Sequence, residues 1–146
     1  MKHARWLVMV VAGWLAAGGI ADTGLVVRLE SRGLMVADAE WMATGLVHVV
    51  VFHASWDVPS REVLERLPSL RLDTMKVRVV AMDVVDPRTQ IARQNRVSRL
   101  PDIRIRLADG EWLETSVHGL DELERWLKEL RLLEGAEEFD DGSPDA

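Results

Sequence analysis

The residues best suited to chemistry lie between His53 and Ser60, in a polar loop that follows an apolar run. His53, Asp57 and Ser60 are the residue types of a hydrolytic triad, in which a histidine activates the serine and an aspartate orients the histidine. That chemistry also needs an oxyanion hole and, on many α/β proteins, a Gly-x-Ser-x-Gly turn around the serine. The chain has no such turn and no evident oxyanion hole, so we do not expect a hydrolase.

Histidine is also a common metal ligand, and His48 and His53 lie in one predicted strand. They are separated by an odd number of positions, so their side chains point to opposite faces and cannot bind one metal ion. His118 is isolated in the sequence. We therefore expect neither a metal site nor a cofactor.

The chemically interesting loop joins a predicted strand to a predicted helix. Residues 46–52 are almost wholly apolar and rich in valine, which is typical of a strand covered on both faces. Pro59 opens a helix whose apolar residues recur at helical spacing, and Pro68 must kink or loosen that helix because proline lacks the backbone donor. Such a junction is where α/β proteins place their chemistry.

The rest of the chain predicts a mixed α/β order. We expect strands at residues 25–29, 77–82 and 103–107, the last followed by a turn at Asp109-Gly110 and a returning strand at Trp112-Leu113. We expect helices at residues 37–44, ended by Gly45, and at residues 89–96. A last helix follows Gly119 and is stopped by Gly135, with Asp121 and Glu124 as its capping pair and an inward stripe of Leu123, Trp126, Leu127 and Leu130.

The segment from Trp56 to Ser60 resembles the active-site segment of thioredoxins, in which a buried strand ends in Trp-Cys-Gly-Pro-Cys. Trp56 and Pro59 match that motif, whereas Asp57 and Ser60 occupy the two cysteine positions. Val97 and Pro101 match the family's Val-x-x-x-Pro before its cis-proline, and the hairpin at residues 108–111 follows at the right distance. The resemblance covers residues 25–133 and implies a three-layer thioredoxin-like fold, with about five strands flanked by about four helices.

Thiol–disulfide exchange needs a thiolate to attack and a second thiol to resolve the mixed disulfide. The chain has no cysteine, and Val51 takes the place of the buried acid that assists proton transfer in the family. We therefore expect no classical redox activity. The resemblance leaves open whether the protein is an enzyme, and the missing cysteines favour a protein that is not one.

A bound polypeptide would lie, by the same resemblance, on a surface that we call the peptide-binding surface: Trp56, Asp57, Val58, Pro59, Ser60, Arg99, Leu100 and Pro101. Our first hypothesis is a protein- or peptide-binding module that acts in assembly or chaperoning of other envelope proteins. The alternatives are an oxidoreductase-family subunit beside a cysteine-bearing partner, and a scaffold whose acidic tail does the binding.

Arginines are dense near Pro101, and Arg96, Arg99, Arg104 and Arg106 form a candidate basic docking patch for an acidic partner. Arg88 and Arg93 belong to the same dense region. The alternative is that Arg104 and Arg106 pair with Glu111, Glu114 or helix carboxylates on a solvated face.

The N-terminal residues predict export. Lys2 and Arg5 precede an apolar run at residues 6–21, which we interpret as a signal peptide, residues 1–21, removed before Asp22. The alternative is a membrane anchor, but the run is short of the ~20 residues that span a bilayer. Both place the domain, residues 22–135, outside the cytoplasm, in the periplasm or an equivalent compartment.

Residues 136–146 are acidic and poor in apolar residues, so we expect a disordered tail. Removing Lys2 and Arg5 changes the formal net charge of the chain from -6 to -8. Six of its acids lie from Glu134 onward, so the folded part is only about two charges negative, and nothing suggests a nucleic-acid partner.

Overall fold

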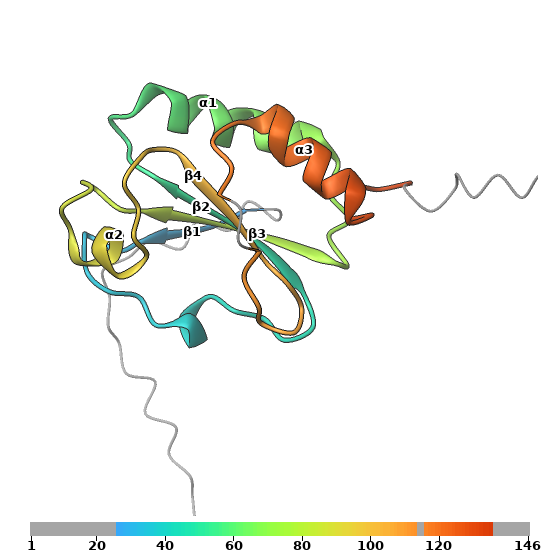
Figure 1. Ribbon diagram of the computed structural model, residues 1–146, viewed down its shortest axis with the longest axis horizontal. Coiled ribbons are helices and arrows are strands. Elements are labelled where there is room, and N and C mark those ends of the chain that lie inside the picture. The colour runs from blue at the N-terminus through green and yellow to red at the C-terminus, as the bar shows by residue number, and fades with distance from the viewer. Residues whose placement is uncertain (1–25, 114–115, 136–146) are drawn as a thin grey trace, which may run out of the picture.

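A computed structural model describes residues 26–113 and 116–135 (Figure 1). Within them a single mixed sheet has the strand order β1-β3-β2-β4. The parallel strands are β1 (Val26–Glu30), β2 (Val47–His53) and β3 (Val77–Asp83), and β4 (Asp102–Arg106) pairs with β2 in antiparallel fashion. The α-helices are α1 (Val58–Arg66), α2 (Gln90–Gln94) and α3 (Leu120–Glu129), with short 3-10 helices η1 (Asp38–Glu40) and η2 (Leu67–Leu70).

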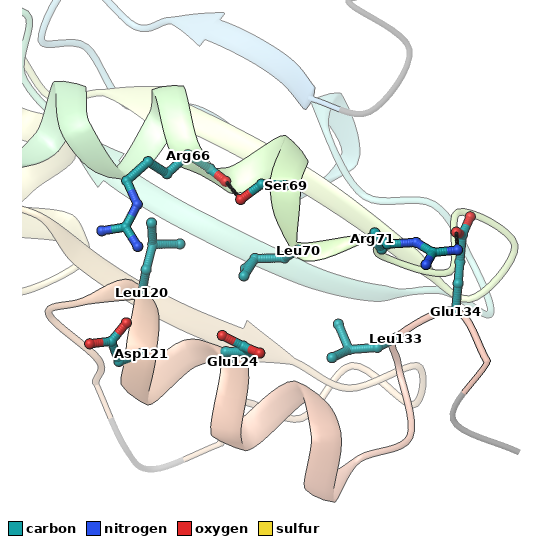
Figure 2. Close-up of a pocket in the computed structure, with 9 residues that line it drawn as sticks. All are labelled: Arg66, Ser69, Leu70, Arg71, Leu120, Asp121, Glu124, Leu133 and Glu134. Atoms are coloured by element: carbon teal, nitrogen blue, oxygen red, sulfur yellow. Dashed lines mark hydrogen bonds and ion pairs between the residues drawn. The ribbon is translucent and has the colours of Figure 1, made fainter. Parts of the chain in front are cut away.

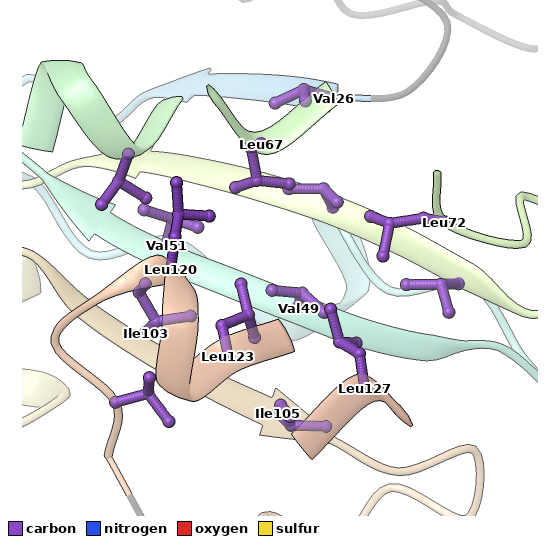
Figure 3. Close-up of a cluster of buried hydrophobic side chains, with 14 of the residues drawn as sticks. Val26, Val49, Val51, Leu67, Leu72, Ile103, Ile105, Leu120, Leu123 and Leu127 are labelled. Atoms are coloured by element: carbon purple, nitrogen blue, oxygen red, sulfur yellow. The ribbon is translucent and has the colours of Figure 1, made fainter. Parts of the chain in front are cut away.

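The sheet has a helix-covered face on the side of α1 and α3. Alternate residues of the strands, such as Val49 and Val51, point to this face and meet Leu123 and Leu127 of α3 in one apolar cluster (Figure 3). Each fully buried side chain of this kind stabilises the fold by about 1.5–3 kcal/mol. This cluster fixes α1 against the sheet and so positions the loop that precedes α1.

The opposite face of the sheet has much less helix over it. It carries Val50 and Phe52, which pack with Ile91 of α2 and with Trp41, the residue that follows η1. The helix predicted at residues 37–44 is wrong, since only the 3-10 helix η1 forms there. A short segment without a strong N-cap residue and with Thr44 and Gly45 at its end cannot offset the cost of helix nucleation.

Helix α1 begins as the sequence predicts and ends early. Asp57 is its N-cap residue, Pro59 lies in its first turn, and the α-helix stops at Arg66. The chain continues as η2, which contains Pro68, so the predicted loosening at this proline is confirmed.

The last part of the chain differs from prediction in two details. After the turn at Gly110 the described residues form only isolated bridges, Arg106 with Trp112 and Ile103 with Val117, in place of a returning strand. Gly119 is the N-cap of α3 without a side-chain bond, so the predicted capping pair of Asp121 and Glu124 is wrong. The helix also ends at Glu129, well before Gly135, although Leu123 and Leu127 are buried as predicted.

No helix in residues 26–113 and 116–135 is long and apolar enough to cross a membrane. The predicted signal peptide (residues 1–21) and acidic tail (residues 136–146) lie outside the described residues.

Candidate functional site

The residues of the predicted peptide-binding surface lie at one edge of the sheet, but Ser60 and Pro101 are buried there and present no side-chain surface, which corrects the prediction for these two. The parallel strands β1, β2 and β3 all end at this edge, and the antiparallel β4 begins there. Phe52 near the end of β2 pairs with Asp102 at the start of β4. The loop that leads from β2 to α1 therefore lies beside residues 98–101, which lead into β4.

Asp57 and Ser60 are bonded to each other at the start of α1. Asp57 Oδ2 accepts hydrogen bonds from the backbone N–H of Ser60 at 2.9 Å and from Ser60 Oγ at 2.6 Å. Ser60 is fully buried, with 0% of its surface exposed. Its hydroxyl donates directly to the aspartate, so Asp57 and Ser60 act as a helix cap and do not form a triad with His53.

Beneath the loop, the position of the family's buried acid is apolar in this chain. Val51 is fully buried, pairs with Ala81 and Ile103 in the neighbouring strands, and belongs to the cluster on the helix-covered face. No proton-transfer group occupies this position, which agrees with the absence of cysteine from the chain.

Exposed apolar side chains mark the loops at this edge. Trp56 and Val58 are 59% and 51% exposed, and Val85 in the loop after β3 is also exposed. The indole N–H of Trp56 donates to the carbonyl oxygen of Val85 at 2.6 Å, which joins the two loops. An exposed tryptophan held in place in this way offers a fixed apolar contact to a ligand.

Val85 is a part of the site that sequence reasoning missed. Its φ is +64°, in the left-handed region that β-branched residues rarely adopt. Asp83 Oδ1 accepts from the Val85 N–H at 2.8 Å, and the Asp86 N–H donates to the Val84 carbonyl at 2.6 Å. The flanking aspartates signal a turn, but no sequence pattern predicts a valine with positive φ or its bond to Trp56.

Residues 98–101 present backbone groups at the same edge. The Leu100–Pro101 peptide bond is cis, and Pro101 is buried while Arg99 is exposed. Within the described residues, the backbone N–H and C=O groups of Ser98, Arg99 and Leu100 have no hydrogen-bond partner. These residues form a bend before β4, and their unpaired backbone groups are available to pair with another chain.

His118, which looked isolated in the sequence, contacts this segment. Its Nδ1 lies 2.9 Å from the carbonyl oxygen of Pro101. An open cleft of about 400 Å³ begins here, with Pro59 and Glu62 of α1 on one side and His118 and Gly119 on the other. The cleft therefore adjoins the peptide-binding surface.

A second recess continues along the same pair of helices, between η2 and α3 (Figure 2). It measures about 300 Å³ and shares Arg66, Leu120 and Asp121 with the cleft. Its far end is closed by an ion pair of 3.5 Å between Arg71 and Glu134. It lies away from the loops of the sheet edge, so we do not include it in the site.

Arg104 and Arg106 do not belong to an exposed docking patch, which corrects the sequence prediction. Arg104 donates to both carboxylate oxygens of Asp102, at 2.6 and 3.2 Å, and its guanidinium lies over Phe52 at 5.3 Å from the ring centroid. The side chains of Arg104 and Arg106 are only 22% and 14% exposed. Their charges are already neutralised by ion pairs, so an acidic partner would have to displace Asp102 and Asp38.

Arg106 has a similar role on the same strand. Its Nη1 lies 2.8 Å from Asp38 Oδ2, and its guanidinium lies 5.8 and 5.4 Å from the ring centroids of Trp41 and Trp112. Of the partners that the sequence suggested, Glu111 pairs with neither arginine and Glu114 lies outside the described residues, but Asp38 belongs to η1, in the segment predicted to be a helix. The two arginines cover the sheet face that the missing helix leaves open.

The other members of the predicted patch are placed differently. Arg96 and Arg99 are exposed and make no ion pair with any described residue, and the same holds for Arg88 and Arg93. Arg88 and Arg93 were left out of the predicted patch, although the absence of any acid between Pro87 and Leu100 could have indicated them.

His48 of β2 has a structural role. His48 is buried, its Nε2 accepts the Ala43 N–H at 3.0 Å, and its ring meets Trp41 edge-on at 5.5 Å between centroids. Burial, followed by the charges of Arg78 and Arg106, lowers the pKa of His48. Burial also lowers the pKa of His53, although the nearby Asp83 acts in the opposite direction. Among the described residues, no group of three or more potential ligands is placed to hold a metal ion.

Comparison with known proteins shows the fold. No protein-family model matches the chain, and no curated protein sequence matches it. Among solved structures it is similar to spinach chloroplast thioredoxin f, with 17% identity, a TM-score of 0.57, and coverage of 74% of this chain and 88% of that one. A thioredoxin from Plasmodium falciparum gives 17% identity, a TM-score of 0.56, and coverage of 78% and 95%.

A thioredoxin from Trypanosoma brucei brucei gives 21% identity, a TM-score of 0.51, and coverage of 64% and 81%. The chain therefore has a thioredoxin-like α/β fold. The described residues form four strands and three α-helices, close to the about five strands and about four helices that the resemblance implied. With no cysteine anywhere in the sequence, it is a thioredoxin-like domain without the redox-active thiols.

Proposed function

We propose that the protein is a redox-inactive peptide-binding module, which holds an extended segment of another protein at the sheet edge. The observation that carries this proposal is the unpaired backbone of residues 98–100 beside the exposed side chains of Trp56 and Val58. An extended peptide can pair with such a segment in β fashion, and this mode of binding requires no thiol.

Three elements of the surface would share the binding. Backbone groups of Arg99 would pair with the peptide, and each hydrogen bond would contribute about 0.5–1.5 kcal/mol. Trp56 and Val58 would cover its apolar side chains, and the cleft beside Pro59 and His118 has room for one side chain. A few such contacts predict reversible binding, with a dissociation constant on the order of micromolar.

The residues at the cysteine positions would contribute shape alone. Asp57 and Ser60 cap α1 and leave no nucleophile at the surface, so the isolated protein should not accelerate the reduction of insulin by dithiothreitol. Acceleration above the buffer rate would overturn the redox-inactive part of the proposal.

The proposed setting is outside the cytoplasm, where removal of residues 1–21 would release the domain to hold segments of other exported proteins during their assembly. The support for export is the basic and apolar pattern of those residues.

Site-specific photo-crosslinking in the native cells tests the binding role. A benzoylphenylalanine is placed at Val58 or Arg99 of the full chain, with Arg125 on the exposed side of α3 as the matched control position. We expect crosslinked protein adducts from positions 58 and 99 and none from position 125. Equal labelling at the three positions, or none at 58 and 99, would contradict the proposal.

A further inference from the structure

The segment from Pro87 to Leu100, which includes α2, is the most uniformly basic part of the described surface. It contains Arg88, Arg93, Arg96 and Arg99 and no aspartate or glutamate. All four arginines are exposed, and none forms an ion pair with a described residue. Elsewhere on the described surface, Arg71, Lys76, Arg125 and Lys128 each lie beside a carboxylate, whereas Arg28, Arg32, Arg61, Arg66 and Arg131 also form no ion pair with a described residue. The segment therefore differs in having four arginines and no acid, and not in the lack of ion pairs alone.

Three of the four charges are close in sequence. Arg93, Arg96 and Arg99 follow at intervals of three residues, so the Cα atoms of neighbours in this series are at most ~11 Å apart. This is comparable with the Debye length of about 8–10 Å at physiological salt. Arg93 lies in the last turn of α2, where a positive charge is favourable, but the other two lie beyond the helix. The segment therefore stores repulsion that a negatively charged ligand would relieve.

This arginine segment is continuous with the peptide-binding surface. Arg99 belongs to both, and the unpaired backbone of residues 98–100 begins two residues after Arg96. A recess of about 410 Å³ extends from Gln94 and Arg96 to Trp112 and Leu113. A peptide paired with residues 98–100 can thus continue past Arg96 and Arg93 with room for its side chains.

We propose that the segment held by this module is acidic, and that Arg88, Arg93, Arg96 and Arg99 select it. This inference rests on the proposed peptide-binding function and adds the chemistry of the partner. Carboxylates spaced along an extended peptide would each meet a guanidinium of the arginine segment, which is the donor geometry that carboxylates prefer. A long polyanion fits less well, because the whole chain carries a net charge of -6 and would repel it outside this segment.

The protein's own acidic tail is not the occupant that the fold favours. α2 packs on one face of the sheet and α3 on the other, and α2 and the C-terminal end of α3 lie at opposite ends of the molecule (Figure 1). A chain spans at most about 3.6 Å per residue, so Glu137 and Glu138 stay close to Gly135, and only the acids further along the tail could extend toward the arginine segment. The occupant we propose is a segment of another protein, and competition by the tail peptide is an outcome of the test below.

Fluorescence anisotropy with three labelled decapeptides tests this selectivity: Glu-Ala, Gln-Ala and Lys-Ala repeats. For the purified full-length protein at 50 mM salt, we expect the acidic peptide to bind at least tenfold more tightly than the neutral one. The preference should fall severalfold at 500 mM salt because exposed charges are screened. The triple variant Arg88→Glu, Arg93→Glu, Arg96→Glu should lose the preference and keep its binding of the neutral peptide.

A matched control variant reverses three positive charges on α3 and just after it: Arg125→Glu, Lys128→Glu and Arg131→Glu. This variant should keep the preference for the acidic peptide. Circular dichroism checks that both variants are folded. Binding of acidic and neutral peptides with equal affinity would overturn the acidic selectivity and leave the peptide-binding role in place. Failure to bind any peptide, together with no crosslinks at positions 58 and 99, would overturn both.

Two further probes separate other partners. Tighter binding of a ten-nucleotide oligodeoxyadenylate, or of phosphatidylglycerol vesicles, than of the acidic peptide would overturn the choice of a protein segment. A synthetic peptide of residues 134–146 can be added to compete with the labelled Glu-Ala peptide. If it binds with the same affinity, the surface is acid-selective and accepts the tail of a second copy.

Discussion

Asp57 and Ser60 give the protein a different use for the two positions that carry cysteines in thioredoxins. The aspartate caps two donors of Ser60, the backbone N–H and the hydroxyl, and Pro59 between them fits the first helical turn. A buried hydroxyl is tolerated only when it is hydrogen-bonded, so each of the two residues requires the other. The strand-turn-helix geometry is kept without any reactive group.

Replacing this cap should lower stability and leave the surface chemistry unchanged. Asp57→Ala removes the acceptor of the cap, which costs about 0.5–2 kcal/mol, and leaves the buried Ser60 hydroxyl without a partner, which costs a further ~1–3 kcal/mol. Urea unfolding should show the loss, and the double variant Asp57→Ala, Ser60→Ala should recover part of it. If the single and double variants were equally unstable, Ser60 would not depend on Asp57.

His48 should make stability depend on pH. Burial and the nearby Arg78 and Arg106 lower the pKa of His48 in the folded state, so the unfolded chain binds its proton first as the pH falls. The contribution of the neutral ring is complete above about pH 6.5, the ordinary pKa, and is lost as the pH falls through the lower folded-state pKa. Protonation also removes Nε2 as the acceptor of the Ala43 N–H.

We therefore expect the free energy of unfolding to decrease between pH 7.5 and 5.5. His53 has a lowered pKa as well and should contribute with the same sign. Urea titrations at several pH values should show a shallower slope for His48→Gln and a still shallower slope for His48→Gln, His53→Gln. An unchanged slope in the double variant would show that other groups control this pH range.

The elements divide the molecule into a well-covered face and a poorly covered face of one sheet. Helices α1 and α3 cover the first, whereas only α2 and the turn at η1 approach the second. On the second face Arg104 lies over Phe52, and Arg106 lies over Trp41 and Trp112. These side chains cover apolar surface that a helix would otherwise cover.

Arg106 should accordingly matter more than a surface arginine. Arg106→Ala removes the contact with Asp38 and the two aromatic contacts, and we expect a loss of about 2 kcal/mol because the cation is mostly buried. Arg125→Ala, which breaks the exposed pair with Glu122, should cost less than ~0.5 kcal/mol. Urea unfolding followed by tryptophan fluorescence compares them, and equal losses would contradict a covering role for Arg106.

Local sequence patterns predicted the elements of the well-covered face. The valine-rich runs gave β2 and β3, the helical spacing and Pro59 gave α1, and the stripe of Leu123 and Leu127 gave the inward side of α3. These elements satisfy their own periodicity, so tertiary contacts only reinforce them.

The other face depends on contacts that no local pattern encodes. Asp38 lies beside Arg106 on this face, and Trp56 bonds to Val85 in the loops at the sheet edge, each pair across a long stretch of chain. The helix propensity of residues 37–44 is weak, and the short 3-10 helix η1 is sufficient to bury Trp41. At the site, the motif located Asp57 and Ser60, but their mutual hydrogen bond and the contact of His118 with Pro101 required the structure.

At the scale of the whole molecule, stability and proposed binding are carried by different parts. The larger apolar cluster lies between the sheet and the helices α1 and α3, while the peptide-binding surface and the arginine segment lie on loops and on α2. With no disulfide available, packing in this cluster carries much of the stability of the domain. Changes to the exposed side chains of the binding parts should therefore leave the fold intact, whereas Asp57 and Ser60 also cap α1.

Leu127 and the arginine segment provide the test of this separation. Leu127→Ala removes a fully buried side chain beneath α3 and should cost about 2–5 kcal/mol, because the cavity cannot collapse between helix and sheet. Leu130→Ala, at the half-buried end of the same helix, should cost less. The variant Arg88→Glu, Arg93→Glu, Arg96→Glu should change the free energy of unfolding by less than ~1 kcal/mol in total, since exposed substitutions have small effects. Urea unfolding of the three variants measures their free energies of unfolding. If the arginine variant lost as much stability as Leu127→Ala, the basic segment would be part of the core. Stability and binding would then not be separate.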